Sequence, residues 1–206
     1  MAKKSTRKKK DPSDALIDAA LKLAAERGWW RLTMAEIADQ AGVGLDTAGA
    51  FFLSKSAIIN DLISRVDDAA SAASRDNNAD DSPRDRLFDI LMRRFDVLAP
   101  YKLGLAAILR DMPRDPFAGL CHLRRLRRSM TAMLEAAGIP SDGCGGQIRA
   151  KALAVIYANA VRVWLNDDSP DMAKTMAALD NGLAQAEKLA AIVWPTQAPK
   201  ASPNAA

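Results

Sequence analysis

Few residues in this 206-residue chain could act as nucleophiles, bases or metal ligands. His122 is the only histidine, which excludes His-based catalytic triads and sites with several histidine ligands. The two cysteines, Cys121 and Cys144, are too few for a disulfide framework and lack metal-ligand spacing. The sequence also shows no phosphate-binding loop, dinucleotide fingerprint or paired base and nucleophile. We therefore expect a protein that is not an enzyme and has no cofactor or metal.

Two charge clusters allow other interpretations. Asp167, Asp168 and Asp171 suggest a cation site, although negative charge at a helix N-terminus explains them more simply. Four arginines lie close together, and they could bind lipid headgroups or an acidic effector, or form a solvated helix face. These are Arg124, Arg125, Arg127 and Arg128.

The net charge of +4 is concentrated at one end of the chain. Residues 1–10 hold six of the 29 basic residues and no acid, so the remaining 23 basic residues face 25 acidic ones. A charge run without apolar residues is expected to be disordered by itself. Net charge therefore supports contact with nucleic acid only through a flexible arm.

The elements that must position these residues all have helical periodicity, and no alternating run is long enough for a strand. We expect an all-α fold of about nine helices. The first spans 14–27 with Ser13 as its N-cap, and the stretch from Pro195 is expected to be disordered. No apolar run reaches the roughly 18 residues of a membrane span, and the first 20 residues do not resemble a signal peptide, so we expect a cytoplasmic protein.

The segment from Thr33 to Lys55 predicts a helix-turn-helix. Thr33 and Glu36 have the spacing of a capping box, and the helix that they open ends near Gly42. A glycine turn over 42–44 leads into a second short helix over 45–51. In such a motif the second helix enters the DNA major groove.

This segment resembles the TetR family of transcriptional repressors. The similarity covers about residues 13–66, including the run from Thr33 to Val43 and Phe52 three residues before Lys55. It implies a DNA-binding domain over 11–66 and a helical ligand-binding and dimerisation domain over 67–194. Tails over 1–10 and 195–206 would flank these two domains.

The resemblance also implies roles for single residues. Thr33 and Lys55 would bind phosphate, although a plain N-cap and a solvated lysine are the simpler interpretations. Leu45, Asp46 and Thr47 would face base edges. The full set expected to contact double-stranded operator DNA is Thr33, Gly44, Leu45, Asp46, Thr47, Phe51 and Lys55, with Lys8, Lys9 and Lys10 of the arm.

The predicted second helix departs from the family pattern. Gly49 stands where members commonly have a phosphate-binding tyrosine, and Asp46 stands where members often have a glycine. Asp46 repels phosphates unless it accepts a hydrogen bond from a cytosine amino group. Residues 11–66 hold eight acidic and five basic residues, so non-specific DNA affinity would depend on the arm.

Residues from about 84 to 190 resemble a second family with the TetR fold, the lipid-binding accessory protein of ubiquinone biosynthesis. The similarity lies in the run from Ala154 to Tyr157, in Val163-Trp164-Leu165 and in the segment from Asp168 to Asp171. It implies a protein that binds a lipid or isoprenoid and does not read DNA.

Flexible and aromatic side chains in the middle of the chain could line an apolar pocket. Few polar residues are expected on the inward helix faces, so we expect a small hydrophobic effector. A simple bundle core is the alternative. The candidate pocket residues are Phe88, Met92, Phe95, Ile108, Met112 and Phe117.

The last two predicted helices could pair with a second subunit. The TetR resemblance implies a four-helix interface in a homodimer, whereas the alternative is packing within one chain. The candidate interface residues are Val161, Trp164, Met172, Met176, Leu179 and Leu183.

Three functions remain open at this point. The first is a repressor that a small hydrophobic effector releases from DNA. The second is a lipid-binding accessory protein without sequence-specific DNA binding and without integral membrane association. The third is non-specific DNA binding through the arm alone.

Overall fold

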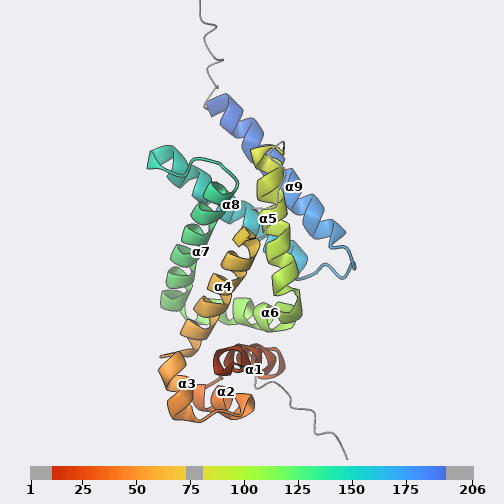
Figure 1. Ribbon diagram of the computed structural model, residues 1–206. Coiled ribbons are helices and arrows are strands. Elements are labelled where there is room, and N and C mark those ends of the chain that lie inside the picture. The colour runs from red at the N-terminus through yellow and green to blue at the C-terminus, as the bar shows by residue number, and fades with distance from the viewer. Residues whose placement is uncertain (1–10, 73–80, 194–206) are drawn as a thin grey trace, which may run out of the picture. The chain divides into compact units, whose positions relative to one another are not determined.

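The computed structural model describes residues 11–72 and 81–193, without the side chains of 116–118 and 190–193. Every regular element in this part is helical, which confirms the all-α prediction of about nine helices (Figure 1). None of these helices is long and apolar enough to cross a bilayer. The α-helices are α1 (Pro12–Arg27), α2 (Met34–Ala41), α3 (Leu45–Phe51), α4 (Lys55–Ala72), α5 (Pro83–Leu98), α6 (Lys102–Asp111), α7 (Pro116–Ala136), α8 (Gly143–Trp164) and α9 (Ala173–Val193), with 3-10 turns η2 (Ala99–Tyr101) and η3 (Met112–Arg114).

The chain divides into two compact units, Met1–Ile139 and Pro140–Ala206. This division differs from the functional boundary predicted at residues 66 and 67, which α4 crosses as one unbroken helix. The separate DNA-binding and ligand-binding roles on either side of that boundary stay a prediction. The two predicted tails lie outside the described residues.

The first helix begins earlier than the sequence suggested. Asp11 is its N-cap, because the Asp11 side chain accepts a hydrogen bond from the Ser13 N–H at 2.8 Å. Pro12 occupies the first turn, where backbone N–H groups have no acceptor within the helix, so the N–H that proline lacks is not needed. Ser13 is buried inside the helix, so the predicted cap at Ser13 is wrong.

Helix α1 packs against α6 at very close range. A Cβ atom at Gly104 of α6 would lie only 2.5 Å from the Leu21 carbonyl oxygen of α1, so any side chain there would push the two helices apart. Before α6, the Tyr101 hydroxyl donates to Asp18 of α1 at 3.1 Å. Since α1 also contacts α2 and α3, it connects the first three helices, here called the head, to the rest of the first unit.

Helices α4, α5 and α7 pack on one another beyond the head. Their apolar stripes supply the core, and burial of each large side chain contributes roughly 1.5–3 kcal/mol. The fully buried members include Ile58 and Val66 of α4, Ile90, Leu91 and Phe95 of α5, and Met130 and Met133 of α7.

The second unit contains α8 and α9, which contact each other closely. A Cβ atom at Gly182 of α9 would lie 2.6 Å from Cγ2 of Ile156 in α8. Asp167 holds the start of α9, because its Oδ2 accepts from the Thr175 N–H at 2.9 Å and from the Thr175 hydroxyl at 2.8 Å. These bonds fix the acidic connector as a helix cap, and no group of three or more metal-ligating side chains occurs among the described residues.

Candidate nucleic-acid interface

Helices α2 and α3 form the predicted helix-turn-helix. Thr33 Oγ1 accepts from the Glu36 N–H at 3.3 Å, and Glu36 Oε2 accepts from the Thr33 N–H at 2.9 Å, so the predicted capping box is present. Gly42 ends α2 at a φ of +70°, a left-handed conformation that glycine adopts without strain. Gly44 then begins α3 in an extended conformation.

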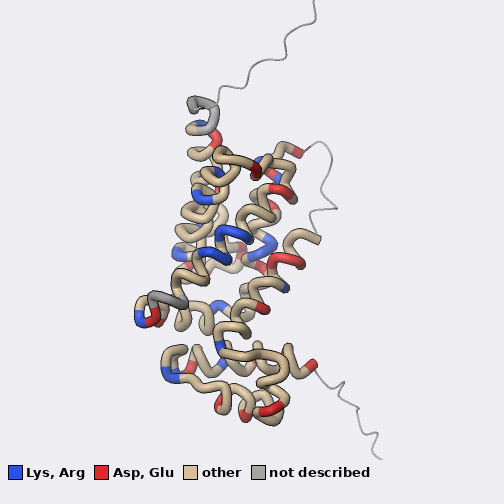
Figure 2. Tube along the Cα trace, turned by 90° about the vertical axis from the view of Figure 1, so that its left-hand side faces the viewer, with Lys and Arg blue, Asp and Glu red and all other residues tan. Residues whose placement is uncertain are grey.

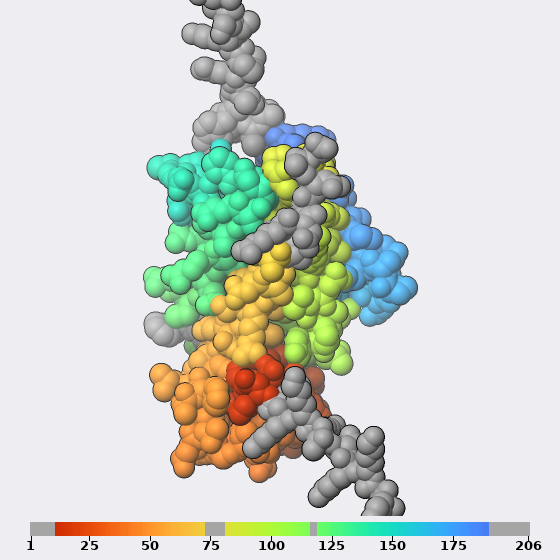
Figure 3. Space-filling model, in the orientation of Figure 1, coloured from red at the N-terminus to blue at the C-terminus, as the bar shows by residue number. Residues whose placement is uncertain are grey.

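Helix α3 buries one residue and exposes most of the others. Ala48 is buried, whereas Gly44, Asp46 and Thr47 are exposed. Leu45 is 54% exposed, Phe51 is 48% exposed, and Leu53 after the helix is 95% exposed. The surface of α3, within the orange lower end of Figure 3, is thus accessible where DNA contact was predicted, but its large side chains are apolar.

The Thr33 hydroxyl is occupied within the head. It donates to Glu36 Oε2 at 2.8 Å, and the backbone hydrogen bond from Thr33 is the main cause of the lowered pKa of Glu36. The Glu36 carboxylate therefore takes the position that an anion prefers at a helix N-terminus. Phosphate binding by Thr33 stays a prediction, and it requires Glu36 to move aside.

Lys55 also points its ammonium group into the head. Nζ donates to the carbonyl oxygens of Trp29 at 2.9 Å, Trp30 at 3.1 Å and Leu32 at 3.1 Å, which uses all three of its N–H donors. It also lies 5.2 Å from the centre of the Trp29 ring. Lys55 thus holds the α1–α2 connector, and the predicted phosphate contact requires it to leave these carbonyls.

The surface of the helix-turn-helix is acidic. No lysine or arginine occurs from residue 32 to residue 54, whereas Glu36, Asp39 and Asp46 are all exposed. Acidic segments accordingly lie along the lower edge of the head in Figure 2. The arm residues Lys8, Lys9 and Lys10 lie outside the described residues.

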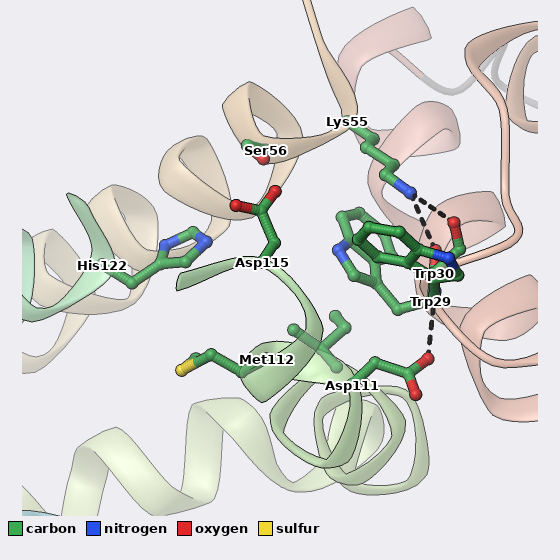
Figure 4. A pocket seen from close by; sticks show the side chains of 9 residues that line it. Trp29, Trp30, Lys55, Ser56, Asp111, Met112, Asp115 and His122 are labelled. Carbon is green, nitrogen blue, oxygen red and sulfur yellow. Dashed lines mark hydrogen bonds between the residues drawn. The ribbon is translucent and has the colours of Figure 1, made fainter. Parts of the chain in front are cut away.

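A small pocket lies where the head meets α4, α6 and α7. Its volume is about 40 Å³, and its lining includes Trp29, Trp30, Lys55, Asp111 and His122 (Figure 4). Asp111 Oδ2 accepts from the Trp30 N–H at 3.0 Å, and this backbone bond is the main cause of the lowered pKa of Asp111. The volume of this pocket is far below the roughly 300 Å³ of a site that holds a whole ligand.

The predicted effector residues do not gather in one place. Phe95 is fully buried in the core, Phe88 and Met92 are half-buried, and the Phe117 side chain lies outside the described residues. Ile108 and Met112 line the small pocket beside Trp29. An effector site at these residues stays a prediction.

Few polar residues fall inward, but those that do include a buried charged cluster that the sequence analysis did not predict. Arg94 of α5 is 1% exposed and Ser129 of α7 is 4% exposed, and both bond to Asp67 of α4. Sequence reasoning missed this cluster, although Arg94 lies on the apolar stripe of Leu91 and Leu98 and its position therefore indicated burial. Asp111 was missed as well, because only the fold brings it to Trp30.

The predicted dimer residues are partly covered within one chain. Trp164, Leu179 and Leu183 are buried, which leaves them unavailable to a second subunit in this conformation. Val161, Met172 and Met176 are half-buried. The dimer interface stays a prediction, and α8 exposes two further apolar residues, Ile148 at 53% and Val155 at 70%.

An all-α chain with an exposed second helix in a helix-turn-helix has the architecture of a DNA-binding regulator. Residues 16–62 match the family model described as "Bacterial regulatory proteins, tetR family", and residues 123–190 match the family model COQ9. The N-terminal part of the chain is thus similar to TetR-family regulators, and its C-terminal part is similar to COQ9. The TetR family is a family of regulators and not of enzymes.

Solved structures show the same fold at low sequence identity. The TetR transcriptional regulator of Nitrosomonas europaea is 22% identical with a TM-score of 0.70, covering 86% of this chain and 99% of its own. A TetR-family regulator of Syntrophomonas wolfei is 14% identical with a TM-score of 0.66, covering 90% and 98%. One of Streptomyces coelicolor is 17% identical with a TM-score of 0.60, covering 88% and 82%. Comparison with curated proteins gives no match.

Proposed function

We propose that the protein is a cytoplasmic, homodimeric repressor that releases its operator DNA when a small effector binds among α4–α7. The observation that carries the proposal is the exposed α3 in a helix-turn-helix that matches the TetR family model over residues 16–62. Two such helices on a two-fold axis fit two half-sites of an operator.

The contacts of the head support a route for release. α4 begins at Lys55, which holds the connector of the head, and it continues to Ala72 between α5 and α7. α6 is tied to the same connector through Asp111. An effector that favours another arrangement of α4 and α6 would change the spacing of the two heads, so that they no longer match successive major grooves.

The charge distribution assigns different roles in DNA binding to the basic arm, residues 1–10, and to α3. Because residues 32–54 hold no basic residue, phosphate attraction comes from the six basic residues of the arm, while α3 supplies any sequence preference. The dimer in this proposal forms through α8 and α9, and Ile148 and Val155 on the exposed face of α8 extend the predicted interface.

Salt titrations of operator binding test the proposal. The full chain and a variant without residues 1–10 are titrated with promoter DNA from beside the gene and with scrambled DNA. We expect a preference for the promoter that weakens but survives truncation, and a salt slope that becomes shallower by up to about five per subunit. Equal affinity for both DNAs, or complete loss of binding on truncation, would contradict a sequence-reading repressor.

Asp46→Asn refines the test of α3. If Asp46 accepts from a cytosine amino group, the substitution weakens promoter binding and leaves scrambled DNA unaffected. If Asp46 only repels phosphate, both DNAs bind more tightly. Asp39→Asn, an exposed acidic residue on α2, is the matched control.

A second function is favoured by a specific observation. Residues 123–190 match COQ9, and α3 exposes Leu45 and Phe51 but carries no basic residue that could bind phosphate. The alternative is a lipid- or isoprenoid-binding accessory protein of ubiquinone biosynthesis that does not bind a specific DNA sequence. Native mass spectrometry of the purified full chain separates the two functions, because a co-purified isoprenoid together with absent promoter binding favours the accessory protein.

A further inference from the structure

We infer that the effector is an acid and that its anionic group binds beside Arg125 of α7, next to the buried Asp67–Arg94 ion pair. The inference rests on the proposed repressor function, because it names the chemical class of the effector. It differs from the hydrophobic effector expected for the apolar pocket, and it develops the acidic effector that the arginine cluster allowed.

A buried ion pair lies within electrostatic reach of Arg125. Arg94 Nη1 bonds to Asp67 Oδ1 and also donates to Ser129 Oγ at 2.6 Å, while the Ser129 hydroxyl donates to Asp67 at 2.9 Å. Three helices, α4, α5 and α7, thus meet at one carboxylate. Burying charges in this way is unfavourable unless each is paired and hydrogen-bonded.

Arg125 adds a second positive charge near the Asp67 carboxylate. It lies one turn before Ser129 on the same face of α7, it is half-buried, and its charge acts on Asp67. Its Nε is buried and has no hydrogen-bond partner. A guanidinium stays protonated at all accessible pH values, so the Arg125 Nε–H remains a buried donor without an acceptor, which is unfavourable. The charges of Arg94 and Arg125 both act on the Asp67 carboxylate, and an anion beside Arg125 would supply the acceptor that its Nε lacks.

The surroundings place the anion on the Arg125 side. One turn earlier on α7, His122 lines the small pocket together with Ile108, Met112 and Asp115 (Figure 4). Burial lowers the pKa of His122, and the nearby Arg125 charge lowers it further, whereas the Asp115 carboxylate raises it. Asp115 repels an anion at that end. Ile108 and Met112 could contact only a short apolar part of the acid, because the pocket that they line has a volume of about 40 Å³.

The location suits a regulatory ligand. Asp67 belongs to α4, the helix that starts in the head at Lys55, whereas Arg125 belongs to α7. An anion bound to Arg125 weakens the attraction between Arg125 and Asp67, and thereby alters the electrostatic contact between α7 and α4. A ligand shifts a conformational equilibrium only through such a difference in interaction between states.

Calorimetric titration of the full chain tests the inference with three carboxylates of increasing size, namely acetate, phenylacetate and octanoate. Each acid is compared with its neutral amide. We expect saturable binding of at least one acid, with its amide binding roughly tenfold or more weakly, because a charge-assisted hydrogen bond is lost. Arg125→Gln should weaken the acid by a similar factor. Arg128→Gln, which changes an exposed arginine on the same helix, should leave it unchanged.

Equal binding of acid and amide, equal effects of the two arginine variants, or no saturable binding of any of the three acids would overturn the inference. The comparison of acid with amide in the unaltered protein keeps the test decisive if Arg125→Gln fails to fold. Operator binding is measured separately without any acid. Promoter binding without acid binding therefore rejects only the inference, whereas acid binding without promoter binding rejects the repressor function.

Discussion

The Asp111 carboxylate accepts a hydrogen bond from the main-chain N–H of Trp30 at 3.0 Å, across 81 residues of sequence. Asp111 is the last residue of α6, and Trp30 lies in the connector between α1 and α2. Gly28 fits beside this bond in a left-handed conformation, since a Cβ atom there would lie 3.3 Å from the carboxylate. The end of α6 thus fixes the entry to the helix-turn-helix.

Asp111→Ala should loosen this connector while leaving the core folded. The Trp30 N–H loses its acceptor, so hydrogen–deuterium exchange in residues 28–33 should become faster, with α5 unaffected. Asp96→Ala, which removes an exposed carboxylate from α5, is the control. Unchanged exchange at Trp30 would show that the bond does not hold the connector.

Lys55→Met should destabilise the protein even without DNA. The change leaves the carbonyl oxygens of Trp29, Trp30 and Leu32 without their donor, which is expected to lower the free energy of unfolding by about 2 kcal/mol. Urea unfolding followed by tryptophan fluorescence measures this. Lys22→Met alters an exposed lysine of α1 and should have little effect. A variant that is fully stable but fails to bind promoter DNA would instead assign Lys55 to phosphate binding.

Acid stability should depend on Asp167. Hydrogen bonds from Ser169 and Thr175 lower the pKa of Asp167 well below the usual range. Because the folded pKa lies below the unfolded value, the stabilisation is present above about pH 4 and is lost as the pH falls further. Denaturant midpoints between pH 6 and pH 2 should therefore fall more steeply for the unaltered chain than for Asp167→Asn. Asp142→Asn, at an exposed position before α8, should follow the unaltered chain.

Two glycine substitutions should have opposite effects. Gly49→Ala in α3 meets no atom within 4 Å and removes a poor helix former, so we expect a gain of about 1 kcal/mol. Gly182→Ala in α9 forces a methyl group toward Ile156 and should lower stability. Thermal unfolding measures both. A stabilising Gly182→Ala would mean that α8 and α9 separate at little cost.

Local sequence patterns predicted the helices and the helix-turn-helix because caps and periodicity act over a few residues. The capping box of Thr33 and Glu36 is an example, and its geometry agrees with the prediction. Lys55 was harder, because the three carbonyls that bind it lie 23–26 residues earlier and only the fold brings them together. Burial of Trp164, Leu179 and Leu183 within one chain likewise depends on packing that periodicity cannot distinguish from a dimer seam.

The unbroken course of α4 has a mechanical consequence. At a rise of 1.5 Å per residue, Lys55 and Asp67 are about 18 Å apart along the axis, so the helix is a lever with one end in the connector and the other at the buried ion pair. A tilt of about 10° at Asp67 would displace Lys55 by roughly 3 Å, comparable to the length of a hydrogen bond. A small tilt of α4 at Asp67 would thereby move Lys55 far enough to break its hydrogen bonds to the connector.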